Sequence, residues 1–561
     1  MIWAVTASMV VSVGLMVAVG ILGPSAAVPA FPSAAPWPPY FTAAGPAESV
    51  AAIAAWLGVA LGGAGLVAAL LAARRGWRPQ PRRLLGGCLL AVVALLLIPP
   101  TGSTDMLDYA VYGRIAVLGH SPYQLTPARL AQTGDPVGAV APRPWRFAHS
   151  VYGPVATVTE QAASALAGPS AARTVFWLKL WNALAYLAVA LALDRLLRSD
   201  PAARTRAHLM WSVNPLMLWA VLAGGHIDGL AAAAGFLGLL CLRRAGAGRG
   251  AAPGLLLGAA IAVKAPFVLF LPGAAWAARR SPRTLAGAAL GVVAVLVPAY
   301  LLAGRAAINA LASRAAGGPD LYQPWQLLTR TLGIHHPTRF TDIAALLTSA
   351  VLAVLLVRRL PRLAGPGEPA GRQPDSGWQG APSLAWSRQL PVSQAAWITM
   401  ALSLAWLVCS PQQRPWYDAM IFPLLALLPA TRLDWIVVAR ALAAALAEIP
   451  GVIFYAGLRP HWLAVAADLI ARGLAPLTLV LAAVTLVWLC MTGQWLPPRR
   501  AGAARVDPAG GLSSPGTSGG QGSPAGTAAS ALRPGPDQAL PRGSAGTRGL
   551  PGRGNQRSPA G

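Results

Sequence analysis

The chain has 561 residues, of which 55% are hydrophobic and only 11% carry a charge. Soluble globular domains average about 25% charged residues, so this composition excludes a soluble protein. The formal net charge of +26 comes almost entirely from arginines in short clusters between apolar runs. Membrane topology requires that distribution, which argues against nucleic acid as a partner.

Long apolar runs predict membrane-spanning helices. Many approach or exceed the roughly 20 residues that cross a bilayer as a helix, and they are continuously apolar, unlike the alternating strands of a barrel. We expect spans near residues 2–23, 49–73, 84–100, 174–194, 208–222, 229–242, 283–303, 341–357, 392–408, 418–431, 434–456 and 463–491. With two short helices in 253–278, the sequence predicts an all-α integral membrane protein of about 14 helices, its first span retained rather than cleaved.

Arginine clusters predict which side of the membrane each loop faces. The clusters at 74–83, 195–206, 243–249, 279–283, 358–362 and 499–500 should face the cytoplasm. This threading places the acid- and aromatic-rich segments outside, at 101–172, 223–228, 304–340, 409–418 and 457–462. The sequence therefore predicts a multi-pass protein of the plasma membrane with a large first extracytoplasmic loop and its active site outside.

Segment 253–278 has arginines on both sides, so its two ends should lie on the same side of the membrane. It is too short to cross twice at full thickness. Pro266 disfavours helix at the residue before it, so we expect two short helices with Lys264 near the turn. A charge at mid-membrane costs roughly 2.5–3.5 kcal/mol and is a functional candidate, here for contact with a phosphate.

Two segments lack the composition of a packed core. The loop 361–391 is rich in Pro, Gly, Gln and Ser, as in a cytoplasmic linker. The end of the chain has almost no large apolar residues. We therefore expect one membrane domain over 1–496 and a disordered cytoplasmic tail over 497–561. The four cysteines form no CxxC pair and are expected to be small core residues.

Residues 101–154 carry the densest group of candidate catalytic side chains. If residues 103–113 are helical, Asp105, Asp108 and Tyr109 share one helix face, because they lie three and four residues apart. A carboxylate can act as a general base toward a sugar hydroxyl, and aromatic rings stack on the C–H faces of sugars. The alternative is a solvated helix start whose acids are favoured by the helix dipole.

Tight turns and outer loops supply candidates for substrate contact. The turn at 119–123 (GHSPY) would present Tyr123, and SVYGP at 150–154 would present Tyr152, although interfacial aromatics are common in membrane proteins. A Gly-Gly turn would present His226 and Asp228, too few ligands for a metal site. The full set of such candidates, with some from the motifs below, is Tyr109, Arg114, Tyr123, Trp145, Tyr152, His226, Asp228, Lys264, Trp325, Arg414, Trp416 and Tyr417.

Arg414 is almost the only arginine placed outside near a span, and arginine suits a bidentate hold on phosphate. No P-loop, GxGxxG, GxSxG or HExxH occurs in a suitable context, which argues against nucleotide hydrolysis and against a nucleotide-sugar donor. A lipid-phosphate sugar, flipped across the membrane, would be available to an enzyme on the outer face. The residues indicate no cofactor and no metal, and leave a divalent cation open.

Six motifs occur in a specific order. They are D-x-x-x-Y-x-x-x-G-R (105–114), G-x-x-P-Y (119–123), W…S-x-Y-G-P (145–154), N-P-L…G-G-H-x-D (214–228), V-K-A-P (263–266) and P-W-Y (415–417). Together they resemble the actinobacterial polyprenol-phosphate-mannose-dependent α-1,6-mannosyltransferases over about residues 85–490. The resemblance implies a multi-span helical bundle of the GT-C glycosyltransferase type, which builds the mannan core of lipomannan and lipoarabinomannan.

The resemblance also implies roles and partners. Asp105 would deprotonate the acceptor hydroxyl, which attacks the anomeric carbon with inversion as the lipid phosphate leaves. Asp108 departs from the family pattern, and would either share that role or orient the substrate. The implied partners are a polyprenyl-phosphate-mannose donor, a lipid-linked mannan acceptor and membrane lipids. Transfer of arabinose or glucose, and a transporter or flippase of lipid-linked glycans, are the alternatives; a transporter should carry polar residues deep in several spans.

Overall fold

The computed structural model describes residues 2–142, 145–242, 250–315, 320, 322–334, 338–358, 390–452 and 457–495. All regular elements in these ranges are helices, and a lone bridge joins Ala34 to Trp37, so the predicted all-α class is confirmed. The predicted disordered tail over 497–561, almost all of the predicted linker over 361–391 and the arginine cluster at 243–249 lie outside the described residues.

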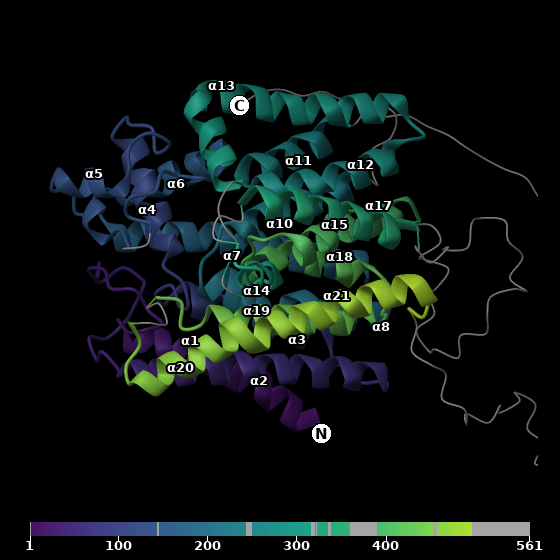
Figure 1. The fold of residues 1–561 in the computed structure, drawn as a ribbon, viewed down its shortest axis with the longest axis horizontal. Helices are drawn as coiled ribbons and strands as arrows, with labels where there is room; N and C mark the ends of the chain where they lie inside the picture. Colours follow the sequence, from purple (N-terminus) through teal and green to yellow (C-terminus); the bar gives the residue numbers. More distant parts are fainter. Residues whose placement is uncertain are drawn as a thin grey trace, which may run out of the picture. The chain divides into compact units, whose positions relative to one another are not determined.

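Six helical stretches in the described ranges are long and apolar enough to cross a membrane, or seven if one bent pair counts as a span. This confirms a multi-span membrane protein. The long stretches are α1 (Ile2–Leu22), α2 (Glu48–Arg74), α7 (Ala171–Leu196), α13 (Pro282–Ala315), α15 (Thr338–Arg358) and α20 with α21 (His461–Leu469, Ala475–Thr492). Figure 1 shows the long helices running alongside one another, with α4 (Asp105–Val117), α5 (Pro127–Gln132) and α6 (Pro154–Ala167) together at one end.

Four further predicted spans, 84–100, 392–408, 418–431 and 434–456, overlap helices. These are α3 (Pro81–Leu96), α17 (Leu390–Cys409), α18 (Phe422–Leu427) and α19 (Leu433–Glu448), of which all but the 20-residue α17 are shorter than a full crossing. Prolines explain three of these early ends, because the residue before a proline disfavours helix. Pro99 follows α3, Pro429 follows α18 and Pro450 follows α19. Within the described ranges, α3, α18 and α19 are thus too short to cross a membrane alone.

Two breaks bring polar residues into the helical bundle. Between η3 (Leu218–Ala223) and α10 (Asp228–Leu242) the chain turns at Gly225, whose φ of 72° favours glycine. The helices on either side of that break are bent by 119°. Between α11 (Ala251–Val263) and η4 (Ala265–Leu269), Lys264 is extended, with φ −149° and ψ 118°, which confirms the break predicted before Pro266.

Helix α11 is too short to cross a membrane alone. Its 13 residues rise about 20 Å, less than the ~30 Å hydrocarbon core of a bilayer. Small residues let α11 approach its neighbour α13 closely: a Cβ added at Gly254 would lie 2.1 Å from the carbonyl oxygen of Ala288. After the break, η4 and α12 (Phe270–Ala278) continue the segment.

Buried charges that tie helices together are paired. Asp434 of α19 accepts from Arg206 of α8 (Pro201–Ala207) at 2.5 and 3.1 Å and from Arg74 of α2 at 3.3 Å. Arg440, also on α19, pairs with Asp418 of the preceding short helix η6 (Pro415–Met420). Because an uncompensated buried charge is strongly destabilising, these pairs fix how α2, α8, η6 and α19 pack.

Gly113 sets the contact between α4 and α6, and its replacement should loosen that end of the molecule. A Cβ at Gly113 would lie 2.2 Å from the carbonyl oxygen of Glu160. We expect Gly113→Ala to lower the stability by about 1–3 kcal/mol through overpacking. Thermal unfolding of the purified protein in detergent measures this.

Gly86→Ala is the matched control, because Gly86 is also helical and nothing lies within 4 Å of its added Cβ. It should unfold at or above the wild-type temperature, since alanine favours helix by about 1 kcal/mol over glycine. Equal unfolding temperatures for the two variants would contradict the close α4–α6 contact.

Candidate active site

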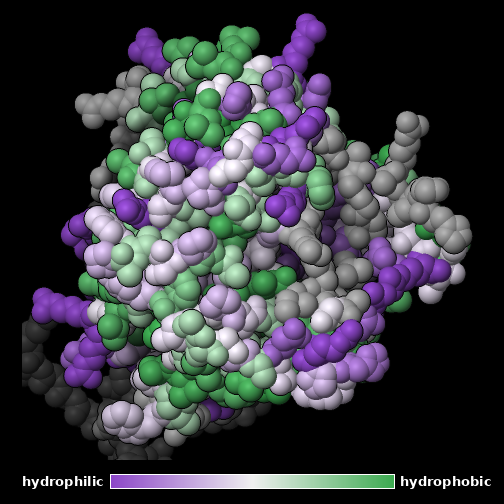
Figure 2. All heavy atoms as spheres, turned by 90° about the vertical axis from the view of Figure 1, so that its left-hand side faces the viewer, coloured by the Kyte–Doolittle hydropathy of each residue, from purple (hydrophilic) through white to green (hydrophobic). Residues whose placement is uncertain are grey.

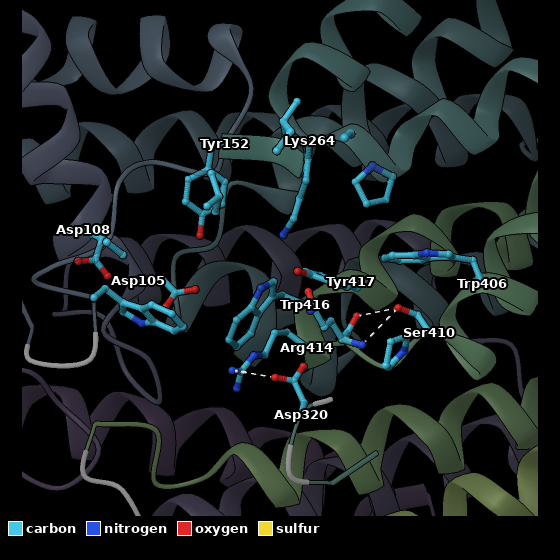
Figure 3. Close-up of a pocket in the computed structure, with 18 of the residues that line it drawn as sticks. Asp105, Asp108, Tyr152, Lys264, Asp320, Trp406, Ser410, Arg414, Trp416 and Tyr417 are labelled. Carbon is cyan, nitrogen blue, oxygen red and sulfur yellow. Dashed lines mark hydrogen bonds and ion pairs between the residues drawn. The ribbon is translucent and has the colours of Figure 1, made fainter. Parts of the chain in front are cut away.

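A cavity of about 990 Å³ opens where the loops and helix breaks meet. Pockets for small ligands commonly measure about 300–1,000 Å³, so this one could hold a sugar and part of a lipid phosphate. Figure 2 views the end of the molecule that carries α4 to α6, where polar and apolar residues mix around a hollow. Figure 3 shows acids, cations and aromatic rings directed into the cavity from several elements.

The cavity joins segments that lie far apart in the sequence. Its lining comes from 103–112 and 145–152, the Lys264 break, 311–349, 406–417, and the end of α19 with Gly451. Three of the five segments predicted to lie outside, 101–172, 304–340 and 409–418, thus converge on one site. The turn at 223–228 reaches the same site from behind the lining, as the contacts below show.

Asp105 begins α4 at the cavity wall. The backbone N–H of Asp105 donates to Ser103 Oγ at 3.2 Å, and its side chain is 15% exposed. Burial raises the pKa of Asp105 to about 6; Arg414 and Lys264 oppose the rise, and Glu448 and Asp228 add to it. A carboxyl with this pKa is ionised at neutral pH and more basic than an ordinary aspartate, which suits a general base.

His226 lies behind Asp105 and has a defined tautomer. Its Nδ1 is 2.6 Å from the carbonyl oxygen of Ala220, which only accepts, so Nδ1 carries the proton. Nε2 accepts from Ser103 Oγ at 3.0 Å and lies 3.7 Å from Asp105 Oδ2. Burial lowers the pKa of His226 to about 3, so the ring is neutral, and it stacks on Trp416 with centroids 3.5 Å apart.

Lys264 points into the cavity with its charge compensated. Its Nζ lies 2.8 Å from each carboxylate oxygen of Asp228, which is 1% exposed. The same ammonium lies 3.9 Å from the ring centroid of Tyr417 and 5.9 Å from that of Tyr152. Lys264 lines the cavity, whereas Asp228 lies behind the lining, as His226 does. Both Lys264 and Asp228 were predicted to touch substrate.

Arg414 holds two acids on the opposite wall. It donates to Glu448 at 2.9 and 3.0 Å and lies 3.2 Å from Asp320 Oδ1, as the dashed line in Figure 3 marks for Asp320. Asp320 Oδ2 also accepts from the backbone N–H of Gln413 at 2.7 Å. A phosphate at Arg414 would therefore meet a guanidinium already shared between two carboxylates.

Some of the predicted aromatic residues line the cavity, and others lie behind or outside its lining. Trp145, Tyr152, Trp416 and Tyr417 line the cavity. Tyr109 is fully buried behind Tyr152, edge to face with centroids 5.0 Å apart. Other predicted contacts lie outside the lining and have structural partners: Tyr123 bonds Thr157 and the Tyr152 carbonyl, Trp325 donates to the Cys409 carbonyl, and Arg114 pairs with Asp135.

Several lining residues were not predicted from the sequence. Trp406 stacks on Tyr417 with centroids 5.8 Å apart, and Asp320, Asp342, Ser410 and Glu448 complete the wall. Glu448 had a detectable signal, because an acid inside a predicted span is a functional candidate by default. Trp406 had none, since it is one aromatic residue in a long apolar run. No group of three or more His, Cys, Asp or Glu side chains in the described ranges could hold a metal ion.

Fold and cavity together define a multi-span helical membrane protein with a polar, acid-rich site built at the breaks of its helices. Residues 10–280 match the family model of the α-(1→6)-mannopyranosyltransferase N-terminal domain. Over 142 residues the chain is 31% identical to a probable α-(1→6)-mannopyranosyltransferase of Mycolicibacterium smegmatis, a match that spans a quarter of this chain and a quarter of the relative. Both similarities agree with the mannosyltransferase family that the motifs resemble, and they cover about half and a quarter of this chain.

The Lys264–Asp228 pair should be needed for stability as well as for the site. Asp228→Asn leaves a buried ammonium without its counter-ion, and we expect a loss of about 3–5 kcal/mol. The double variant Lys264→Met/Asp228→Leu removes both charges and should recover most of it. Thermal unfolding in detergent gives both values.

Asp468→Asn provides the control, because the Arg472–Asp468 pair is exposed, at 38% and 45% of the two side chains. Exposed pairs contribute about 0–1 kcal/mol, so this variant should unfold near wild type. A double variant less stable than Asp228→Asn would contradict the assignment of a compensated buried pair.

Proposed function

We propose that this protein transfers mannose from polyprenyl-phosphate-mannose to a growing α-1,6-mannan of the lipomannan and lipoarabinomannan core, on the outer face of the plasma membrane. The observation that carries the proposal is Asp105, a basic but ionised carboxylate in the wall of a sugar-sized cavity that also contains two cations. The family match over 10–280 supports mannose and the α-1,6 linkage.

In the proposed reaction, Asp105 removes the proton of the acceptor hydroxyl as its oxygen attacks the anomeric carbon. The bond from that carbon to the phosphate oxygen breaks, and its electron pair leaves with the lipid phosphate. Attack from the opposite face inverts the anomeric centre, so a β-linked donor gives an α-linked product. Asp105 then holds the transferred proton until solvent removes it.

Lys264 and Arg414 are the proposed stabilisers of the leaving phosphate. Asp228 can accept two of the three N–H groups of Lys264, which leaves one for a ligand. Such fixed donors stabilise charge that develops in the transition state without reorganising. Because His226 is neutral, its proposed part is to position Asp105 through Ser103 rather than to bind phosphate.

The cavity also supplies surfaces for sugar rings and for lipid. Trp145, Tyr152, Trp416 and Tyr417 are proposed to pack on the C–H faces of donor and acceptor sugars. The outer-face location rests on the arginine clusters, which favour the cytoplasm for the opposite ends of the spans. No step of this mechanism needs a cofactor or a metal ion.

Replacing Asp105 by asparagine should remove the base and keep the fold. We expect Asp105→Asn to lower turnover by roughly 10²–10⁴-fold, the usual range for loss of a general base. The assay follows radiolabel from polyprenyl-phosphate-mannose into a short α-1,6-mannoside. Asp468→Asn, far from the cavity lining, controls for an aspartate-to-asparagine change; wild-type turnover in Asp105→Asn would refute the assignment.

The pH dependence should report the same carboxyl. Only the ionised form of Asp105 accepts a proton, and burial raises its pKa to about 6. We therefore expect kcat/KM to be constant between that pH and neutral pH and to fall about tenfold per pH unit below it. In the same radiolabel transfer assay, arabinosyl- and glucosyl-phosphate lipids are offered as alternative donors. If folded protein transfers neither mannose nor these two sugars, the result would favour a flippase.

A further inference from the structure

Asp108 lies one turn along α4 from Asp105, at the wall of the same cavity. It lines the cavity and is only 4% exposed, and its Oδ1 has no hydrogen-bond partner among the described residues. Figure 3 shows Asp108 and Asp105 on the same side of the cavity. No ion pair involves Asp108 in the part of the chain that the structure describes.

A second acid lies behind it. Glu160 of α6 is fully buried, and neither of its carboxyl oxygens has a partner in the described ranges. The close approach of α6 to α4 at Gly113 excludes a bulky side chain between these helices at that point. Ionising a buried carboxyl without a partner is costly, and ionising two neighbouring ones costs more.

Burial without a hydrogen-bond partner favours the neutral form of both carboxyls. Burial raises the pKa of Asp108 well above its ordinary value, and the nearby Asp105 and Glu160 raise it further. Burial alone raises the pKa of Glu160 in the same direction. Asp105 is the other cavity acid on α4. Because Arg414 and Lys264 lie nearby and its pKa is about 6, Asp105 is ionised at neutral pH.

We propose that Asp108 is a neutral carboxylic acid that donates its O–H to a hydroxyl of the bound sugar, and so orients the sugar beside the base instead of sharing the base's role. The proposal rests on the proposed function for the identity of the sugar. A neutral carboxyl both donates and accepts, which matches a hydroxyl, whereas an ionised one only accepts. A ligand that lacked the hydroxyl would leave a buried polar group unpaired, and the site would discriminate against it.

The protonation state can be measured without any activity. Infrared spectra of the full chain near pH 7 should contain the C=O stretch of protonated carboxyl groups. Asp108→Asn should remove one component of that band and Glu160→Gln another, while Asp105→Asn should remove carboxylate absorption instead. Adding methyl α-mannoside should shift the component assigned to Asp108. Loss of carboxylate absorption in Asp108→Asn would overturn the proposal.

The kinetic test separates orientation from proton transfer. Asp108→Leu removes the donor, and we expect it to lower kcat/KM roughly 10- to 100-fold, mainly through KM. Asp108→Asn keeps an N–H donor and should recover most of that loss, whereas Asp105→Asn should lower kcat. An Asp108→Asn variant as impaired in kcat as Asp105→Asn would overturn the proposal.

The two readouts also distinguish this inference from the proposed function. Wild-type protein that transfers no mannose, yet shows a protonated Asp108 band that shifts with mannoside, would refute the donor assignment and support the role of Asp108. A protonated band that stays unchanged at saturating mannoside in active wild-type enzyme would refute the role of Asp108 alone. Unfolding temperatures of the Leu and Asn variants confirm that both are folded.

Discussion

Compensation of buried charge is the constraint on which the site depends. Lys264 emerges from a helix break, where a lone buried ammonium would be costly, and Asp228 meets it with both oxygens at 2.8 Å. That contact requires the chain to break twice, at the Gly-Gly turn before α10 and at Lys264 after α11. On the facing wall Arg414 requires Asp320 and Glu448 in the same way. The cavity is the space between these two compensated cations.

The same compensation sorts the carboxyls of the cavity into different chemical roles. Acids that face a cation pair with it and hold it in place. Asp105 lies near both cations without a direct pair, so its pKa rises only to about 6, where a base is both ionised and reactive. Asp108, one helical turn away, forms no ion pair in the described ranges and lies near the buried Glu160. Two aspartates three residues apart on one helix thus differ by their surroundings alone.

Much of the fold could be predicted from the sequence because apolar length and proline placement act locally. The break at Lys264 followed from Pro266 and from arginines on both flanks. The pairing of Lys264 with Asp228 and of Arg414 with Glu448 could not be predicted, because each joins residues that only the tertiary fold brings together. For that reason His226 and Asp228 were predicted to touch substrate, although they contact Asp105 and Lys264 from behind the lining.

Both halves of the chain build the cavity, so the family match alone describes only part of it. Residues 10–280 contain Asp105, its neighbour Asp108, and the Lys264–Asp228 pair. Arg414, Glu448 and the stacked Trp406 and Tyr417 come from beyond the matched region. Trp416 joins this second region to the matched region, because its ring stacks on the ring of His226. The geometry of the base in the first half therefore depends on an aromatic residue supplied by the second.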